Sequence, residues 1–135
     1  MKDFRNEQLL VLVIDDDREV LDEVSGVLCG ANLACCCCTT AKEALAAVEA
    51  TLPDLILCDV HLHGESGVET CQQIKLRPGL EDVPLMYLSA AQLPDVIRRS
   101  DAAGGIYWLR KPFAANVLIE LIDQALGVPE GAASL

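Results

Sequence analysis

The sequence predicts an α/β fold, a doubly wound sandwich in which helices cover both faces of a parallel five-stranded sheet. Three observations support this prediction. Apolar runs of strand length alternate five times with segments whose apolar residues recur at helical spacing. These runs are almost unbroken, as in strands that are buried on both faces. The 135 residues, 52% of them hydrophobic, suffice for one compact core and leave no room for a second domain.

The expected strands are the apolar runs themselves, and they cover residues 9–14, 33–38, 55–58, 84–89 and 106–110. The helices between them are expected to begin near residues 18, 40, 66 and 94, and a last helix ends at about residue 126. We therefore expect one domain over residues 9–127. An extension of residues 1–8 precedes it, and a flexible tail of residues 128–135 follows it.

Helix boundaries follow from start signals. Thr40 with Glu43, and Ser66 with Glu69, have the spacing of a capping box. Pro94 suits the first position of a short fourth helix that ends near residue 103. In the last helix, the expected core stripe consists of Val117, Leu118, Leu121, Ala125 and Leu126.

The charge of the chain limits its partners. Asp and Glu number 21 against 10 Lys and Arg, a formal net charge of −11 at pH 7. Such a field repels nucleic acids and anionic lipid surfaces, so any output through DNA or RNA needs a partner protein. The apolar runs fall short of the roughly 20 residues that a membrane span needs, and the charged start is unlike a signal segment. We expect a soluble, cytoplasmic protein without membrane insertion.

Seven cysteines, four of them consecutive at positions 35–38, are expected to be reduced. Their number is odd, and adjacent cysteines do not reach disulfide geometry without strain. A redox or metal role for the run competes with simple packing, because a free cysteine packs like a small hydrophobe. We favour packing. A zinc site that includes His61 and His63 is disfavoured, because the cysteines lack the usual zinc spacings.

Polar residues stand at the ends of four of the five strands. Asp15, Asp16 and Asp17 follow the first, Asp59 the third, Ser89 the fourth and Lys111 the fifth, a set of six residues. In an open parallel sheet, ligands bind at the carboxyl ends of the strands, where the chain order reverses. A strand order of 2-1-3-4-5 would bring these groups together. Several carboxylates in one pocket need a cation, and hard oxygen ligands select Mg²⁺. With a lysine beside them, the carboxylates indicate phosphoryl transfer.

Four strings of residues at these strand ends resemble the response-regulator receiver family of two-component signalling. The strings are VLVIDDD at 11–17, PDLILCD at 53–59, LSA at 88–90 and KPF at 111–113. The resemblance covers roughly residues 9–126. It implies a flavodoxin-like (βα)5 sandwich with the strand order 2-1-3-4-5, and a signalling phosphoacceptor rather than an enzyme. Self-catalysed phosphotransfer and hydrolysis are the only chemistry it implies.

The resemblance also implies roles for single residues. Asp59 would be the phosphoacceptor, and Lys111 and Ser89 would contact the phosphoryl oxygens. Mg²⁺ would be held by the side chains of Asp15, Asp16 and Asp59 and by the backbone carbonyl of His61. Ser89 and Trp108 would form the switch that responds to phosphorylation.

Partners follow from the same resemblance. A histidine kinase or a histidine phosphotransfer protein would donate the phosphoryl group. A target protein would bind the face made of the fourth helix, fifth strand and fifth helix, where Arg98, Arg99 and Tyr107 lie. His61 and Ala91 would flank the path of the attacking water and tune hydrolysis.

Two residues depart from the family pattern. His63 stands where a proline is usual, so the loop of residues 60–67 is expected to be less rigid. Trp108 stands where a tyrosine or phenylalanine is usual, so the switch aromatic is larger than in the family pattern.

Other interpretations remain open at this point. The three aspartates could simply cap the first helix. Asp15 and Asp17 could belong to a haloacid-dehalogenase-like phosphatase, with Asp15 as its nucleophile, although a further acidic motif is missing after the lysine strand. A receiver that acts as a scaffold without phosphorylation is a third possibility.

Overall fold

A computed structural model of the chain describes residues 8–90 and 106–127. Five strands form one sheet in the order β2-β1-β3-β6-β7, and every neighbouring pair is parallel. The strands are β1 (Leu10–Ile14), β2 (Ala34–Cys38), β3 (Leu55–Asp59), β6 (Leu85–Ser89) and β7 (Ile106–Arg110). By position along the chain this is the order 2-1-3-4-5, so the predicted fold class is confirmed.

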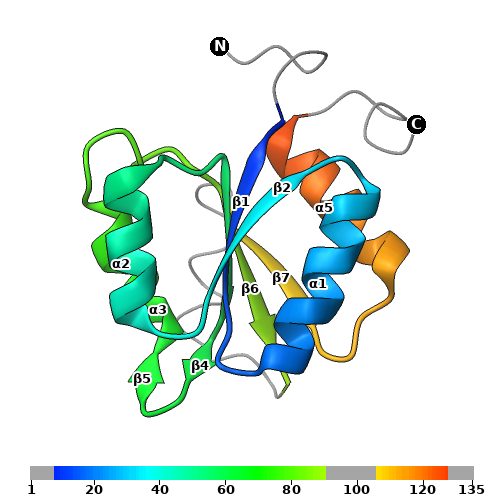
Figure 1. The fold of residues 1–135 in the computed structure, drawn as a ribbon, viewed down its shortest axis with the longest axis horizontal. Coiled ribbons are helices and arrows are strands. Elements are labelled where there is room, and N and C mark those ends of the chain that lie inside the picture. Colours follow the sequence, from blue (N-terminus) through cyan, green and yellow to red (C-terminus); the bar gives the residue numbers. More distant parts are fainter. Residues whose placement is uncertain (1–7, 91–105, 128–135) are drawn as a thin grey trace.

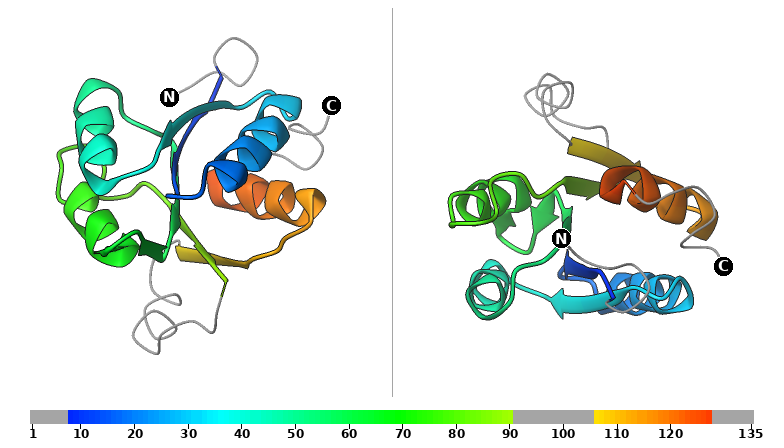
Figure 2. Two further views of the ribbon diagram at one scale, coloured as in Figure 1. Left: turned by 60° about the horizontal axis from the view of Figure 1, so that its bottom comes forward. Right: turned by 90° about the horizontal axis from the view of Figure 1, so that it is seen from above.

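Within the described residues, two helices lie on each face of the sheet. Figures 1 and 2 show α1 (Arg18–Gly30) and α5 (Ala115–Leu126) on one side, with α2 (Ala41–Ala50) and α3 (Gly67–Lys75) on the other. The expected helix near residues 94–103 lies outside the described residues, as do Ala91, Arg98, Arg99, most of the N-terminal extension and the C-terminal tail.

The core consists of two apolar clusters, one on each face of the sheet. Alternate residues of β1 divide between them, since neighbouring side chains on a strand point to opposite faces. Val11 and Val13 lie in the cluster under α1 and α5, while Leu12 and Ile14 lie in the cluster under α2 and α3. All four are buried. This double burial explains why the strand sequences are apolar without a break.

The helices begin where the start signals predict. The side-chain oxygens of Thr40 and Ser66 accept hydrogen bonds from the backbone N–H groups of Glu43 and Glu69, at 3.1 and 3.2 Å. Both residues are therefore N-caps. At α2 the Glu43 carboxylate also accepts hydrogen bonds from the backbone N–H and the hydroxyl of Thr39, the residue before the cap.

The sequence did not predict a hairpin in the loop of residues 60–67, and it predicted a different buried stripe in α5. The loop expected to be less rigid contains a short antiparallel hairpin of β4 (His61–Leu62) and β5 (Glu65–Ser66). In α5 the buried residues are Leu118 and Ile122, one turn apart, while Val117 is 39% exposed. The predicted stripe was therefore wrong at Val117 and missed Ile122. None of the helices in the described ranges is long and apolar enough to cross a membrane.

Candidate functional site

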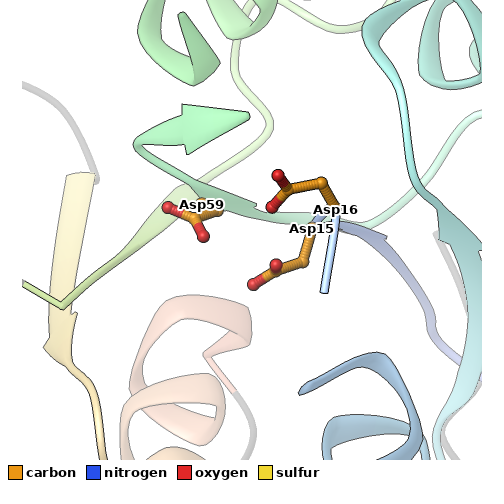
Figure 3. A group of neighbouring side chains, drawn as sticks. All are labelled: Asp15, Asp16 and Asp59. Carbon is orange, nitrogen blue, oxygen red and sulfur yellow. The ribbon is translucent and has the colours of Figure 1, made fainter. Parts of the chain in front are cut away.

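Three carboxylates meet at the carboxyl edge of the sheet. Asp15 and Asp16 follow β1, and Asp59 is the last residue of β3. These strands are neighbours, with Ile14 opposite Cys58, so the next residues of each strand come side by side. One oxygen from each carboxylate lies within 4.8 Å of the others, and Figure 3 shows the three side chains gathered at one place.

Lys111 joins two of these carboxylates. Its ammonium Nζ lies 2.8 Å from Asp15 Oδ2 and 2.7 Å from Asp59 Oδ2. The lysine is placed by the sheet, because its backbone N–H donates to the carbonyl of Ser89 at 2.8 Å and so extends the β6–β7 ladder by one residue. Its side chain is only 17% exposed. The charge pairs are therefore partly shielded from water and stronger than surface ion pairs.

Backbone N–H groups hold the remaining oxygens. Asp15 Oδ1 accepts from the N–H of Asp17, and Asp59 Oδ1 accepts from the N–H of His61, both at 2.9 Å. Each of the two carboxylates therefore has one oxygen held by the turn that follows it and the other by Lys111. This arrangement fixes the orientation of both carboxylates before any ligand binds.

Burial sets the electrostatics of the pair. Desolvation raises the pKa of the Asp15 carboxyl, which has no exposed surface, although Lys111 and the N–H of Asp17 act in the opposite direction. For Lys111, burial acts to lower the pKa, but the hydrogen bonds and charges of Asp15 and Asp59 outweigh it and raise the pKa above its ordinary value. The lysine is therefore firmly cationic at neutral pH.

The other predicted residues differ in how close they come to this cluster. Ser89 ends β6 and is 3% exposed; its neighbour Leu88 lies opposite Asp59 in the sheet. Trp108 lies in the middle of β7, half-buried, with its ring stacked on Tyr87 at a centroid distance of 4.9 Å and an interplanar angle of 21°. Asp17 caps α1 through the N–H of Glu19, so the capping interpretation holds for this aspartate.

Gly67 is a site residue that the sequence reasoning missed. It begins α3, and its N–H donates to the carbonyl of Val60 at 2.8 Å. A Cβ atom at this position would lie 1.8 Å from the backbone oxygen of Asp59, a distance that no side chain can adopt. Glycine is required here because the helix packs directly on the backbone of Asp59. A single glycine in a loop carries no signal in the sequence that would distinguish this contact.

The donor set suits a hard divalent cation. Among the described residues, Asp15, Asp16 and Asp59 form the one group of three or more side chains able to hold a metal ion. All three donors are carboxylate oxygens, the ligand type that Mg²⁺ prefers. One ammonium balances one of three negative charges, so the cluster retains a charge that a cation would neutralise. The residues therefore fit Mg²⁺.

The fold and the site together define a class of proteins. The sheet has the flavodoxin-like order 2-1-3-4-5, in which ligands bind at the carboxyl edge, and the carboxylates and Lys111 lie at that edge. The sequence pattern of the response regulator receiver domain matches residues 11–123, and the chain belongs to this family. Receiver domains of this family bind Mg²⁺ in their acidic pocket, and Asp15, Asp16 and Asp59 fit such a phosphoacceptor site.

Similar proteins agree with this assignment. The DNA-binding transcriptional regulator NtrC of Salmonella typhimurium is 29% identical over 117 residues, which are 87% of this chain and 24% of that protein. The DNA-binding response regulator MtrA of Mycobacterium leprae is 30% identical over 117 residues, 86% of this chain and 50% of that protein. The chain thus spans a quarter to a half of the length of these relatives.

Solved structures show the same fold. The chemotaxis protein CheY4 of Vibrio cholerae superposes with a TM-score of 0.82 at 25% identity, over 89% of this chain and all of that chain. A response regulator of Chloroflexus aurantiacus gives a TM-score of 0.79 at 27% identity, over 90% of this chain and 99% of that chain. Family and fold, both expected from the four strand-end strings, are confirmed, and the phosphatase alternative is set aside.

Proposed function

We propose that this domain accepts a phosphoryl group on Asp59, from a histidine kinase or a histidine phosphotransfer protein. The observation that carries the proposal is the double contact of Lys111 with Asp15 and Asp59 at the carboxyl edge of the sheet. It supports a pocket in which one carboxylate reacts and its neighbours position the reaction. The proposed domain covers residues 9–127.

The burial of the carboxylates favours Asp59 as the acceptor. Asp15 has no exposed surface, whereas the Asp59 side chain is 13% exposed and therefore within reach of a donor. A carboxylate oxygen of Asp59 would attack the phosphorus as the bond from phosphorus to the donor's histidine nitrogen breaks. The proton needed by the departing imidazole comes from solvent or from the donor protein. Asp16 is exposed, and the ion pairs of Lys111 in the described residues are with Asp15 and Asp59 instead.

Mg²⁺ would be held by Asp15, Asp16, Asp59 and the backbone carbonyl of His61. When bound, it neutralises the charge of the pocket and of the incoming phosphoryl group. The turn hydrogen bonds to Asp15 and Asp59 keep these carboxylates oriented for such a role.

Lys111 and Ser89 would bind the phosphoryl oxygens. Lys111 already lies 2.7 Å from Asp59, so phosphorylation would exchange a carboxylate partner for a phosphoryl oxygen without moving the ammonium far. Ser89 would donate its hydroxyl to another oxygen. We propose that its movement is coupled to Trp108, whose ring stacks on Tyr87 of the neighbouring strand. The changed surface of β7 and α5, together with the helix expected near residues 94–103, would then bind a target protein.

The same pocket would later hydrolyse the acyl phosphate, so the domain is its own phosphatase but has no other turnover. Two of the similar proteins are DNA-binding regulators. We therefore propose transcriptional control, through an attached or partner domain, as one output. We further propose that the domain works in the cytoplasm.

Intact mass spectrometry with acetyl phosphate tests the acceptor function. Wild-type protein should gain one phosphoryl group when Mg²⁺ is present and none after chelation, while Asp59→Asn should gain none. Asp82→Asn makes the same change at an exposed carboxylate before β6 and should behave as wild type. If wild type gains no group from either acetyl phosphate or a phosphorylated histidine phosphotransfer protein, the domain is a scaffold that works without phosphorylation.

A further inference from the structure

The edge strand β2 carries four consecutive cysteines, and they divide between the two faces of the sheet. Cys36 and Cys38 face α2, where Cys38 is buried in the apolar cluster and Cys36 packs against it. Cys35 and Cys37 face the other way, toward α1. Packing explains the first pair, as the sequence suggests. The second pair is different, because Cys37 is exposed to solvent.

The thiols of Cys35 and Cys37 are in direct contact. Their Sγ atoms lie 4.0 Å apart, with Cys37 donating to Cys35, and the Cys35 thiol donates to the Ser25 hydroxyl at 3.4 Å. Cys37 also lines a hollow of about 290 Å³ between α1 and the start of α2. The polar residues that line this hollow with it are Arg18, Asp22, Ser25, Thr39 and Glu43. The Cys37 thiol is thus reachable from solvent and in contact with the thiol of the half-buried Cys35.

The backbone geometry of this pair disfavours a disulfide. Residues two apart on a strand have Cα atoms about 6.7 Å apart, at the upper limit for a disulfide, and their parallel Cβ bonds do not converge to the required ~3.8 Å. Strand β2 is held in register with β1 along its whole length, with Cys35 opposite Val11 and Cys37 opposite Val13. Bending the strand enough to close a disulfide would break this ladder. All seven cysteines are free.

The sulfur spacing instead suits a shared metal ion. Zinc–thiolate bonds are about 2.3 Å long, so two sulfurs on one ion of that size lie about 3.8 Å apart at a tetrahedral angle and about 4.6 Å apart in a line. The observed 4.0 Å falls within this range. Thiolate ligands select soft ions such as Cu(I) and Zn²⁺. The two thiols need no large movement to bind one of them.

The number of ligands decides between these ions. Structural zinc is almost always held by four ligands. In the part of the chain that the structure describes, only the carboxylates at the carboxyl edge of the sheet gather three or more metal-binding side chains. The sulfurs of Cys35 and Cys37 therefore have no third metal-binding side chain close enough to complete a zinc site among the described residues. We propose that Cys35 and Cys37 form a two-coordinate site for Cu(I) on the edge strand β2.

The binding step balances without a change of oxidation state. Two neutral thiols and one Cu⁺ give an anionic bis-thiolate complex and release two protons to solvent. Burial first, and the neighbouring Cys35 second, raise the pKa of the Cys37 thiol to about 11, so the free pair is protonated at neutral pH. The complex carries one negative charge; Arg18 is the one cationic side chain among the residues that line the hollow, and the carboxylates of Asp22 and Glu43 line it as well.

The pair on the other face is a natural internal comparison. Burial raises the pKa of the Cys38 thiol further, to about 12, and its surroundings are apolar. An anionic copper complex there would be buried without a compensating charge, which costs far more than at the open hollow. Cu(I) should therefore bind the Cys35–Cys37 pair in preference to the Cys36–Cys38 pair, although the two pairs have the same spacing on one strand.

Competition with the coloured Cu(I) chelator bathocuproine disulfonate, under anaerobic and reducing conditions, tests the proposal. Wild-type protein should withdraw one Cu(I) per chain from the chelator. Cys35→Ser and Cys37→Ser should each weaken the uptake at least tenfold, and circular dichroism checks that both variants fold. Cys29→Ser, which removes an exposed single thiol of α1, and Cys36→Ser, on the opposite face, should bind as wild type.

Three results would overturn the copper site: no withdrawal of Cu(I) by wild type, unchanged binding in Cys35→Ser and Cys37→Ser, or an equal loss in Cys36→Ser. Asp59→Asn protein should bind Cu(I) like wild type. The test of the copper site is therefore independent of the test of the phosphoacceptor site.

Discussion

At the scale of single residues, the site depends on carboxylates that are more buried than their charge favours. Asp15 has no exposed surface, and its ionised form is maintained by Lys111 and by the N–H of Asp17. Removing a charged group from water costs several kcal/mol unless partners replace the lost hydration, and here desolvation is the larger effect. The domain thus holds one carboxylate in a state that weakens the fold but suits a cation.

The raised pKa of Asp15 gives stability a defined dependence on pH. In the folded protein this carboxyl binds its proton more tightly than in the unfolded chain, whose ordinary value is 3.8. Below that value both states are protonated and no penalty arises. As pH rises through the interval above 3.8, the unfolded chain ionises first, so Asp15 lowers the free energy of unfolding.

Asp15→Asn removes this titration. In chelator-treated protein, we expect the free energy of unfolding of wild type, minus that of Asp15→Asn, to fall between pH 4 and pH 7. Urea unfolding at a series of pH values measures it, with Asp82→Asn, at an exposed carboxylate, as the control variant. A difference that increases with pH would mean that Lys111 outweighs the cost of burial.

At the scale of elements, the strands and their ends were predictable, but contacts between backbones were not. The apolar runs locate the strands of the sheet within a residue or two, because burial on both faces leaves no polar positions. Strand order then brings Asp15, Asp59 and Lys111 together. The β4–β5 hairpin escaped prediction because strands of two residues show no periodicity.

The helix α5 illustrates a second limit. Several neighbouring apolar residues allow more than one choice of buried stripe, and the packing against β3 and β7 selects Leu118 and Ile122 over Val117. Helical spacing alone does not distinguish these phases when the whole helix is apolar-rich. The identity of Gly67 is similarly fixed by a tertiary contact, the close approach of α3 to the backbone of Asp59.

The start of α3 should tolerate no side chain at position 67. In Gly67→Ala the new Cβ would have to displace the backbone of Asp59 or the helix, which should lower the free energy of unfolding by more than about 2 kcal/mol. It should also slow phosphorylation by acetyl phosphate. Gly26→Ala is the matched control, because it lies in the exposed part of α1 with no atom within 4 Å of the new Cβ.

Denaturant unfolding compares the two variants directly. Gly26→Ala should gain about 0.5 to 1 kcal/mol, since alanine favours a helix over glycine. Equal stability of the two variants would show that the acceptor backbone yields to α3 at little cost.

At the scale of the whole molecule, charge dominates. The formal net charge is −11, and part of it is concentrated at the carboxyl edge of the sheet. Charge of one sign destabilises a compact chain through self-repulsion. A cation bound only by the folded protein offsets this repulsion at its most concentrated point and adds its own binding free energy to the stability of the fold.

Mg²⁺ should therefore stabilise the wild-type domain against unfolding. At a hundredfold excess over its dissociation constant, a ligand that binds only the folded state adds about 2.7 kcal/mol. Urea unfolding with Mg²⁺, compared with NaCl at the same ionic strength, separates binding from screening. Asp16→Asn should lose most of the Mg²⁺ effect, while Asp82→Asn should keep it. An equal gain in both variants would assign the effect to general screening.

Locating the acyl phosphate tests the central claim most directly. Wild-type protein is phosphorylated with acetyl phosphate and Mg²⁺, the acyl phosphate is reduced with borohydride to homoserine, and the modified residue is identified by peptide mass spectrometry. We expect homoserine at position 59 alone. Homoserine at position 15 or 16, with Asp59 unmodified, would contradict the assignment of Asp59 as the acceptor.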